Sequence, residues 1–270
     1  MKPPVFKIIA GFVLLFACYH TAEYFILYRN SATGFLTISG LFFFAGFIVS
    51  KWQGDKTMNG WGLAVKKSFP VYFLTGLLTG LAVSTLLFLS CLLLDIEVVS
   101  FVPPLHQFLP QAALLIFGCA ISSLTEDVLT RGYIFRHAGH RWTKSLVVAV
   151  SALVYGLNHI HRLDEPVYFL YALVLGIQLA LPLLLTGNIW YTFGVHWAGN
   201  IVYHLTNSVM HTAGGSNAFP PIAMATIFAL LSIPLHLLVC RQLALHTTAG
   251  NSPSLQRHSS AFMRHSSGLI

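Results

Sequence analysis

The sequence predicts an all-α polytopic membrane protein with about eight transmembrane helices. Of its 270 residues, 56% are hydrophobic and only 9% are charged, whereas a soluble domain carries about 25% charged residues. The chain therefore has too little charge to cover a soluble surface. Its apolar residues come in long runs between short polar loops, which predicts one membrane domain over residues 1–246 and no second folded domain.

The apolar runs are each long enough to cross a hydrocarbon core of about 30 Å at about 1.5 Å per residue. Helices are expected because a helix satisfies its own backbone hydrogen bonds in lipid. The alternating segments of about 10 residues that build outer-membrane barrels do not occur in the sequence. Seven of the eight expected segments cover approximately residues 5–28, 34–50, 69–94, 143–160, 166–186, 188–209 and 220–243, and segment four runs from about residue 108 into the stretch 125–132.

The basic residues predict how these segments are oriented. With the N-terminus inside, twelve of the 15 Lys and Arg residues fall in inside regions, and Arg29 and Arg162 fall outside, as the positive-inside rule requires. An even number of crossings puts the C-terminus inside as well. The net charge of +7 then reflects membrane topology, and no nucleic-acid partner is expected. Residues 247–270, rich in Ser and His, are expected to form a disordered polar cytoplasmic tail.

An acid pair at the end of segment four marks the candidate functional site. Glu126, Asp127 and Arg131 follow a long apolar run in a chain with only 8 acidic residues. A charge in the middle of a membrane helix costs about 2.5–3.5 kcal/mol on insertion scales, so an acid pair there indicates function. Asp127 and Arg131 are four residues apart and can pair on one helix face. Glu126 then faces elsewhere, and a desolvated glutamate beside hydrogen-bonding partners suits a general base.

Two later segments carry histidines and an amide. Segment five ends at His159, and segment seven carries His196 and Asn200 one helical turn apart, on one face. If segments four and five form a hairpin turning near residue 141, Glu126 and His159 both lie about 23–27 Å from the turn. The three segments can therefore bring ionisable and amide groups together inside the membrane.

These motifs resemble those of the CAAX protease and bacteriocin-processing (CPBP, or Abi) family of intramembrane proteases. The family's EExxxR, FxxxH and HxxxN motifs are matched, in order, by Glu126-Asp127-Val-Leu-Thr-Arg131, by Tyr155 through His159, and by His196 through Asn200. The resemblance covers roughly residues 110–205. Asp127 replaces a glutamate of the family pattern and Tyr155 a phenylalanine, and both keep the chemical type. By this resemblance Asp127, Arg131 and Tyr155 support the catalytic groups.

The resemblance implies an intramembrane endopeptidase that hydrolyses a peptide bond of a membrane-embedded or lipid-modified substrate. In that mechanism Glu126 activates a water molecule, and His159 helps to hold the water or a metal ion. His196 and Asn200 polarise the substrate carbonyl and stabilise the oxyanion. The family's substrates include prenylated C-terminal peptides, bacteriocin leaders and C-terminal sorting segments, and the sequence does not select among them.

The sequence also leaves the cofactor open. His159, His196 and Glu126 offer two imidazoles and a carboxylate, which can form a zinc site with one open position. A metal-free mechanism, in which Glu126 alone activates the water, fits the same residues equally well.

Two other functions fit a polar cluster inside a membrane. One is a catalytically idle relative of the same fold, acting as a scaffold or as a bacteriocin self-immunity protein. The other is a small ion-coupled transporter whose ion path the cluster lines. Every motif keeps its chemical type, which favours the protease. The expected partners are the lipid bilayer and a membrane protein or lipidated peptide, and the expected location is a bacterial cytoplasmic membrane.

Overall fold

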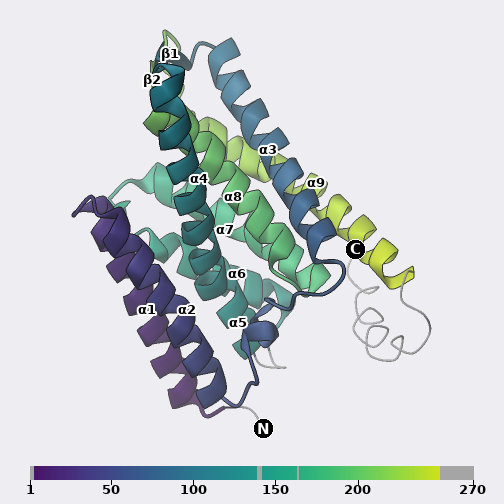
Figure 1. Cartoon of the computed structure of the whole chain (residues 1–270). Coiled ribbons are helices and arrows are strands. Elements are labelled where there is room, and N and C mark those ends of the chain that lie inside the picture. The colour runs from purple at the N-terminus through teal and green to yellow at the C-terminus, as the bar shows by residue number, and fades with distance from the viewer. Residues whose placement is uncertain (1–2, 139–141, 163, 250–270) are drawn as a thin grey trace.

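The computed structural model describes residues 3–138, 142–162 and 164–249 and is helical almost throughout (Figure 1). The predicted tail lies outside the described residues from position 250 onward. The α-helices in the described residues are α1 (Val5–Leu27), α2 (Ala32–Trp52), α3 (Phe69–Leu93), α4 (Leu105–Asp127), α5 (Tyr133–His137), α6 (Lys144–Asn158), α7 (Pro166–Thr186), α8 (Trp190–His204) and α9 (Pro221–Ala249). Shorter elements connect them: the 3-10 turns η1 (Met58–Trp61) and η3 (Ile160–Arg162), and the π turns η2 (Val128–Gly132) and η4 (Leu205–Val209).

Six helical stretches are long and apolar enough to cross a membrane. They are α1, α2, α3, the continuous run Leu105–His137, α7 and the Pro221–Leu245 part of α9. The helices α6 and α8 have 15 residues each, which is about 22 Å at 1.5 Å per residue and less than a hydrocarbon core of about 30 Å. The protein is therefore an all-helical integral membrane protein, but only six of the eight predicted crossings are supported by helix length.

The two shorter helices end before the corresponding predicted segments do. The predicted segment 143–160 stops as an α-helix at Asn158, where the chain turns into η3. The predicted segment 188–209 leaves α-helical geometry at His204 and continues as η4. Apolar run length alone does not reveal where these two helices end.

A two-stranded ribbon is the one β-sheet among the described residues. β1 (Glu97–Phe101) pairs antiparallel with β2 (His211–Gly214), although the sequence predicted loops in both places. Val98, Val99 and Phe101 are residue types that favour strands. Asp95 closes the base of the ribbon by accepting hydrogen bonds from the Ser216 backbone N–H at 3.2 Å and from the Ser216 hydroxyl. The ribbon lies at one end of the helix bundle (Figure 1).

The close packing of α3 on α8 fixes how α8 faces the rest of the bundle. A Cβ atom at Gly194 would lie 2.6 Å from the backbone of α3, at Leu77 N and Phe73 O, so that only glycine fits there. The ring of Phe193 stacks on Phe73 with centroids 5.6 Å apart and on Trp197 at 5.7 Å. With this face turned to α3, α8 directs its polar residues toward α4.

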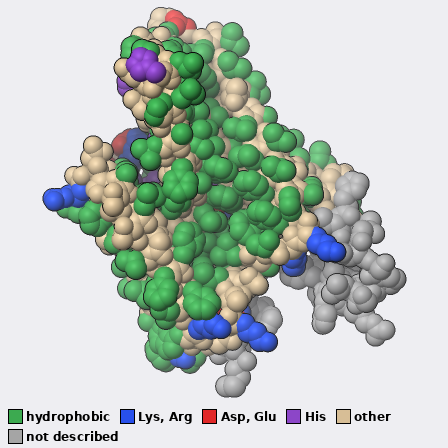
Figure 2. Space-filling model, viewed as in Figure 1, with side chains coloured by type: hydrophobic (Ala, Val, Ile, Leu, Met, Phe, Trp, Pro, Cys, Tyr) green, Lys and Arg blue, Asp and Glu red, His purple; other side chains and the backbone are tan. Residues whose placement is uncertain are grey.

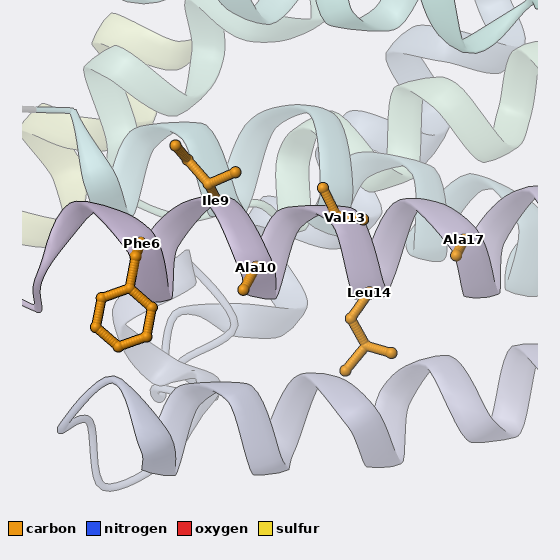
Figure 3. A pocket seen from close by; sticks show the side chains of 6 residues that line it. All are labelled: Phe6, Ile9, Ala10, Val13, Leu14 and Ala17. Carbon is orange, nitrogen blue, oxygen red and sulfur yellow. The ribbon is translucent and has the colours of Figure 1, made fainter.

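The hairpin of α1 and α2 lies against α4 on the side away from α8 (Figure 1). Tyr19 of α1 belongs to a buried apolar cluster that includes Val128 and Leu129 of η2. The opposite face of α1 bears an open apolar hollow, shown in Figure 3, that is lined by Phe6, Ile9, Ala10, Val13, Leu14 and Ala17.

The outer surface has the distribution of side chains that a bilayer requires. Hydrophobic side chains cover the middle of the face in Figure 2, while Lys and Arg lie toward its lower end and its flanks. Phe44 of α2 and Leu78 of α3 are 62% and 66% exposed. Such side chains on a soluble monomer would form an unusually large apolar patch, whereas lipid tails solvate them.

Candidate active site

Three helices bring the predicted ionisable groups together inside the bundle. Glu126 is the next-to-last residue of α4, His159 follows α6 directly, and His196 lies in the middle of α8. Glu126 Oε2 is 3.5 Å from His196 Nε2, and Glu126 Oε1 is 4.0 Å from His159 Nε2. Glu126 and His196 are buried, and His159 is partly exposed. The carboxylate therefore lies between two imidazole nitrogens.

Asp127 connects the arginine of the first motif to the histidine of the third. Arg131 forms an ion pair with Asp127 Oδ1, as the four-residue spacing predicted, and both side chains are fully buried. The same oxygen lies 3.0 Å from His196 Nδ1. An ionised carboxylate only accepts hydrogen bonds, so His196 Nδ1 carries a hydrogen and Nε2 is directed toward Glu126. Asp127 therefore orients His196, a contact that the sequence did not predict.

Tyr155 forms a wall between the two histidines. Its ring centroid is 4.9 Å from that of His159 and 5.9 Å from that of His196. The guanidinium carbon of Arg131 lies 4.5 Å from the same centroid. Two guanidinium nitrogens of Arg131, Nε and Nη2, have no hydrogen-bond partner among the described residues, and the ring face offsets part of that loss.

His159 is oriented by the backbone of its own helix. Its Nδ1 lies 2.9 Å from the carbonyl oxygen of Tyr155. A carbonyl accepts only, so Nδ1 is the donor and Nε2 is the nitrogen that faces Glu126. Both histidines thus present Nε2 to one carboxylate, each held by a hydrogen bond at Nδ1.

Asn158 is the direct hydrogen-bond donor to Glu126, a contact that sequence reasoning missed. Its Nδ2 lies 2.9 Å from Glu126 Oε1, and its side chain is fully buried. The available signal was an amide directly before the motif histidine at the end of an apolar helix. Spacing could not separate a contact to Glu126 from a packing role, because the rotation of α6 is set by its neighbours.

Asn200 does not contact Glu126 in this arrangement. Its Nδ2 donates instead to Ser123 Oγ at 3.0 Å. Ser123 and Asp127 are one turn apart on α4, and Asn200 and His196 are one turn apart on α8, so the two pairs form successive rungs between antiparallel helices. Ser123 was not predicted, and a hydroxyl four residues before Asp127 was its only signal. An amide has two N–H donors, and Ser123 uses one of them.

A π turn carries the motif arginine. The backbone N–H of Tyr133 donates to the carbonyl of Val128, five residues earlier, so η2 is wider than an α-helix. A Cβ atom at Gly132 would lie 2.5 Å from the carbonyl oxygen of Trp61, and only glycine allows this approach. Ser151 of α6 donates to the carbonyl of Thr130 at 2.7 Å. Single π turns are frequent at functional sites, and hydrophobic periodicity does not predict them.

The geometry does not fit the zinc site that the sequence left open. Within the part of the chain that the structure describes, no three His, Cys, Asp or Glu side chains are arranged to hold a metal ion.

Residues 108–202 match the model of a protein family described as type II CAAX prenyl endopeptidase, Rce1-like. This match confirms the predicted family. The matched segment contains all three motifs and the CPBP-type site residues, and it indicates a CAAX-type membrane protease. No curated protein and no solved structure matches the chain. The helices α1, α2 and α3 and the helix α9 lie outside the matched segment.

Proposed function

We propose that the protein is an intramembrane endopeptidase in which Glu126 activates a water molecule for attack on a peptide bond. The observation that carries this proposal is the position of the buried Glu126 carboxylate between His159 Nε2 and His196 Nε2. The prenyl endopeptidase description of the matching family supports a lipidated C-terminal peptide as substrate, because the CAAX motif directs prenylation of its cysteine.

Glu126 acts first as a base and then as an acid. The 4.0 Å between Glu126 Oε1 and His159 Nε2 is too long for a direct hydrogen bond, and one water molecule can bridge it. Glu126 takes a proton from this water as the water oxygen bonds to the carbonyl carbon. The protonated Glu126 returns that proton to the leaving amine as the peptide bond breaks. Asn158 keeps the carboxylate in place through its 2.9 Å hydrogen bond.

His196 and Asn200 supply the oxyanion donors. When protonated, His196 donates from Nε2 to the developing oxyanion while Asp127 accepts from Nδ1 and supports the imidazolium. The second N–H of Asn200 is the further donor, and Ser123 holds the amide through the first. Loss of one such donor lowers kcat by about 10²–10³ in enzymes of this kind.

The metal-free version predicts that activity survives exhaustive chelation of the purified protein. The measurement is the rate of peptide cleavage before and after removal of divalent metal, with metal content determined on the same sample. Loss of activity that zinc restores would favour the alternative in which His159, His196 and Glu126 hold a metal ion.

The orientation is proposed as eight crossings with both termini inside, in a bacterial cytoplasmic membrane. In this arrangement the shorter helices α6 and α8 cross within the bundle, where the surrounding helices cover them. A reporter fused after Lys144 then reads cytoplasmic, and one fused after Glu97 reads outside. The opposite pattern would exclude this topology.

Comparative proteomics tests the function and separates it from the idle scaffold and the transporter. Cells carrying Glu126→Gln in place of the wild-type protein accumulate an uncleaved membrane or lipidated precursor. Glu165→Gln is the matched control, because Glu165 is an exposed acid at the surface, paired with Arg162. If no precursor distinguishes the Glu126→Gln cells from both others, the protein is not acting as a protease.

A further inference from the structure

A third acid lies inside the membrane helices, away from the family motifs. Among the described residues, Glu23 is the one acid within a candidate membrane-spanning helix apart from Glu126 and Asp127. It belongs to α1, outside the segment that matches the family model. An acid in a membrane helix is costly and marks a functional position unless its partners account for it.

The partners of Glu23 form a polar face on α1. Glu23 Oε2 lies 2.9 Å from His20 Nδ1, and the Tyr19 hydroxyl donates to Glu23 Oε1 at 3.3 Å. The His20 Nε2 atom is buried and has no hydrogen-bond partner among the described residues. Tyr19 also belongs to the buried cluster that contains Val128, two residues beyond Glu126. This face of α1 is therefore turned toward the catalytic helix, while the face in Figure 3 is apolar.

The turn after α6 joins this face to the site. The ring of His161 lies 6.3 Å from that of His159. Burial is the main cause that lowers the pKa of His161, and the charges of Glu23, His159, Arg162 and His20 also act on it. The polar residues of α1 and those of η3 therefore lie within electrostatic reach of one another, on the His159 side of Glu126.

The polar side chains on this side of the site are more exposed than Glu126 and His196. The exposed fraction of the side chain is 3% for His196, 5% for Glu126, 17% for His159, 20% for His20 and 34% for Arg162. Figure 2 shows acidic and basic side chains set back below the β-ribbon on the visible face. The more exposed polar side chains near the carboxylate therefore lie on the side of His159, η3 and α1.

We propose that Tyr19, His20 and Glu23, together with His161, form the polar entrance through which water reaches Glu126. The inference rests on the proposed function, which consumes one water per bond cleaved in a region where lipid supplies none. The proton that Glu126 takes returns to the leaving amine, so the entrance carries water and no net proton. Glu23 is a positioning residue, because it holds His20 and Tyr19 in the wall of this entrance and does not touch the substrate.

The test measures water access to position 159 directly. In a chain with its native cysteines replaced by alanine, His159→Cys reacts with a small, charged, water-soluble thiol reagent. Adding Glu23→Leu lowers the labelling rate by at least about tenfold, because an apolar side chain removes hydrogen bonds that stabilise water there. Glu23→Gln keeps a polar side chain, and labelling stays within about threefold of the parent.

Two further variants separate the entrance from the folding of α1. Tyr24→Leu is the matched control, because Tyr24 is the neighbour of Glu23 and 48% exposed, and it leaves labelling unchanged. His161→Trp places a bulky apolar side chain in an exposed turn and lowers labelling without altering α1. Unchanged labelling in both Glu23→Leu and His161→Trp would overturn the proposal. Labelling does not need activity, so it can fail or succeed independently of the protease function.

In chains that retain His159, the same entrance predicts a matching kinetic effect. Glu23→Leu lowers kcat for peptide cleavage with KM little changed, because water supply and not substrate binding is impaired. A fall in kcat with unchanged labelling would point to a purely structural role for Glu23 and would contradict the entrance.

Discussion

Two buried polar clusters lie between the helices of this protein, and both contain a histidine. In the first, Glu126 faces His159 and His196 at 4.0 and 3.5 Å. In the second, His236 of α9 lies 2.7 Å from Gln178 Nε2 of α7 through its Nε2 and 2.9 Å from the Tyr191 hydroxyl of α8 through its Nδ1. The second cluster lacks carboxylates, and both nitrogens of its histidine are engaged.

The comparison shows how a polar cluster that only holds helices together differs from one that can carry out a reaction inside a membrane bundle. The His236 cluster is neutral and closed, so it ties three helices together by interhelical hydrogen bonds. The Glu126 cluster holds charged groups, and neither histidine Nε2 is within hydrogen-bonding distance of the carboxylate. A buried polar cluster therefore indicates a reactive site when it contains ionisable side chains whose hydrogen-bonding atoms are not all engaged. Polarity alone does not indicate a reactive site.

The largest effect is expected at Asp127, which serves both stability and orientation. Asp127→Asn leaves the buried Arg131 charge unpaired and costs about 3–5 kcal/mol of unfolding free energy. It also removes the acceptor that orients His196, and activity falls by about 10⁴ as it does for the equivalent change in a catalytic triad. The measurements are the cleavage rate and unfolding in detergent. Asp127→Glu, the family's residue, retains activity within about tenfold, and equal loss in both variants would contradict the role of the charge.

A smaller effect, of a different kind, is expected in the closed cluster. His236→Leu leaves Gln178 and Tyr191 without their partner and lowers the unfolding free energy by about 1–3 kcal/mol. Cleavage by the folded protein stays within about twofold of wild type, since the partners of His236 are Gln178 and Tyr191 and not Glu126. Thermal unfolding and kcat on one preparation check both parts. A large fall in kcat for the folded variant would erase the distinction between the clusters.

The smallest effect is expected at the ribbon, where water surrounds the charged group. Hydrogen bonds from the Ser216 hydroxyl and backbone N–H lower the pKa of Asp95 below its ordinary 3.8. A lowered pKa stabilises the closed ribbon above the ordinary value, and that contribution is lost as the pH falls through the folded-state pKa. The protection of the Val98 and Val99 amides against hydrogen exchange, relative to the intrinsic rate at each pH, therefore falls in acid. Asp95→Asn removes this acid dependence, and an unchanged pH profile in that variant would refute the assignment.

The sequence predicted the parts of the site that depend on spacing along one helix. The Asp127–Arg131 pair and the shared face of His196 and Asn200 follow from a four-residue repeat. The contact of Asn158 with Glu126 could not be predicted from the sequence, because the rotation of α6 about its axis depends on packing against its neighbours. The π turn η2 was unpredicted because one extra residue per turn leaves no trace in apolar periodicity.

The fold shows the same division between local and non-local information. Long apolar runs predicted a helical membrane protein, because run length and composition are local properties. The pairing of Glu97 with Gly214 joins positions more than a hundred residues apart, so neither strand carried a sufficient signal alone. The helices α6 and α8 appeared long enough in sequence, and only the structure shows where they end.

The most direct test is cleavage of a lipidated C-terminal peptide by purified protein in liposomes made up in water labelled with heavy oxygen. The account predicts that the wild-type protein releases a product whose new carboxylate carries one heavy oxygen atom. Glu126→Gln inserts and unfolds like wild type but cleaves at least about 10²–10⁴ times more slowly. Cleavage by Glu126→Gln at the wild-type rate, with the same label in the product, would contradict the role of Glu126 as the base.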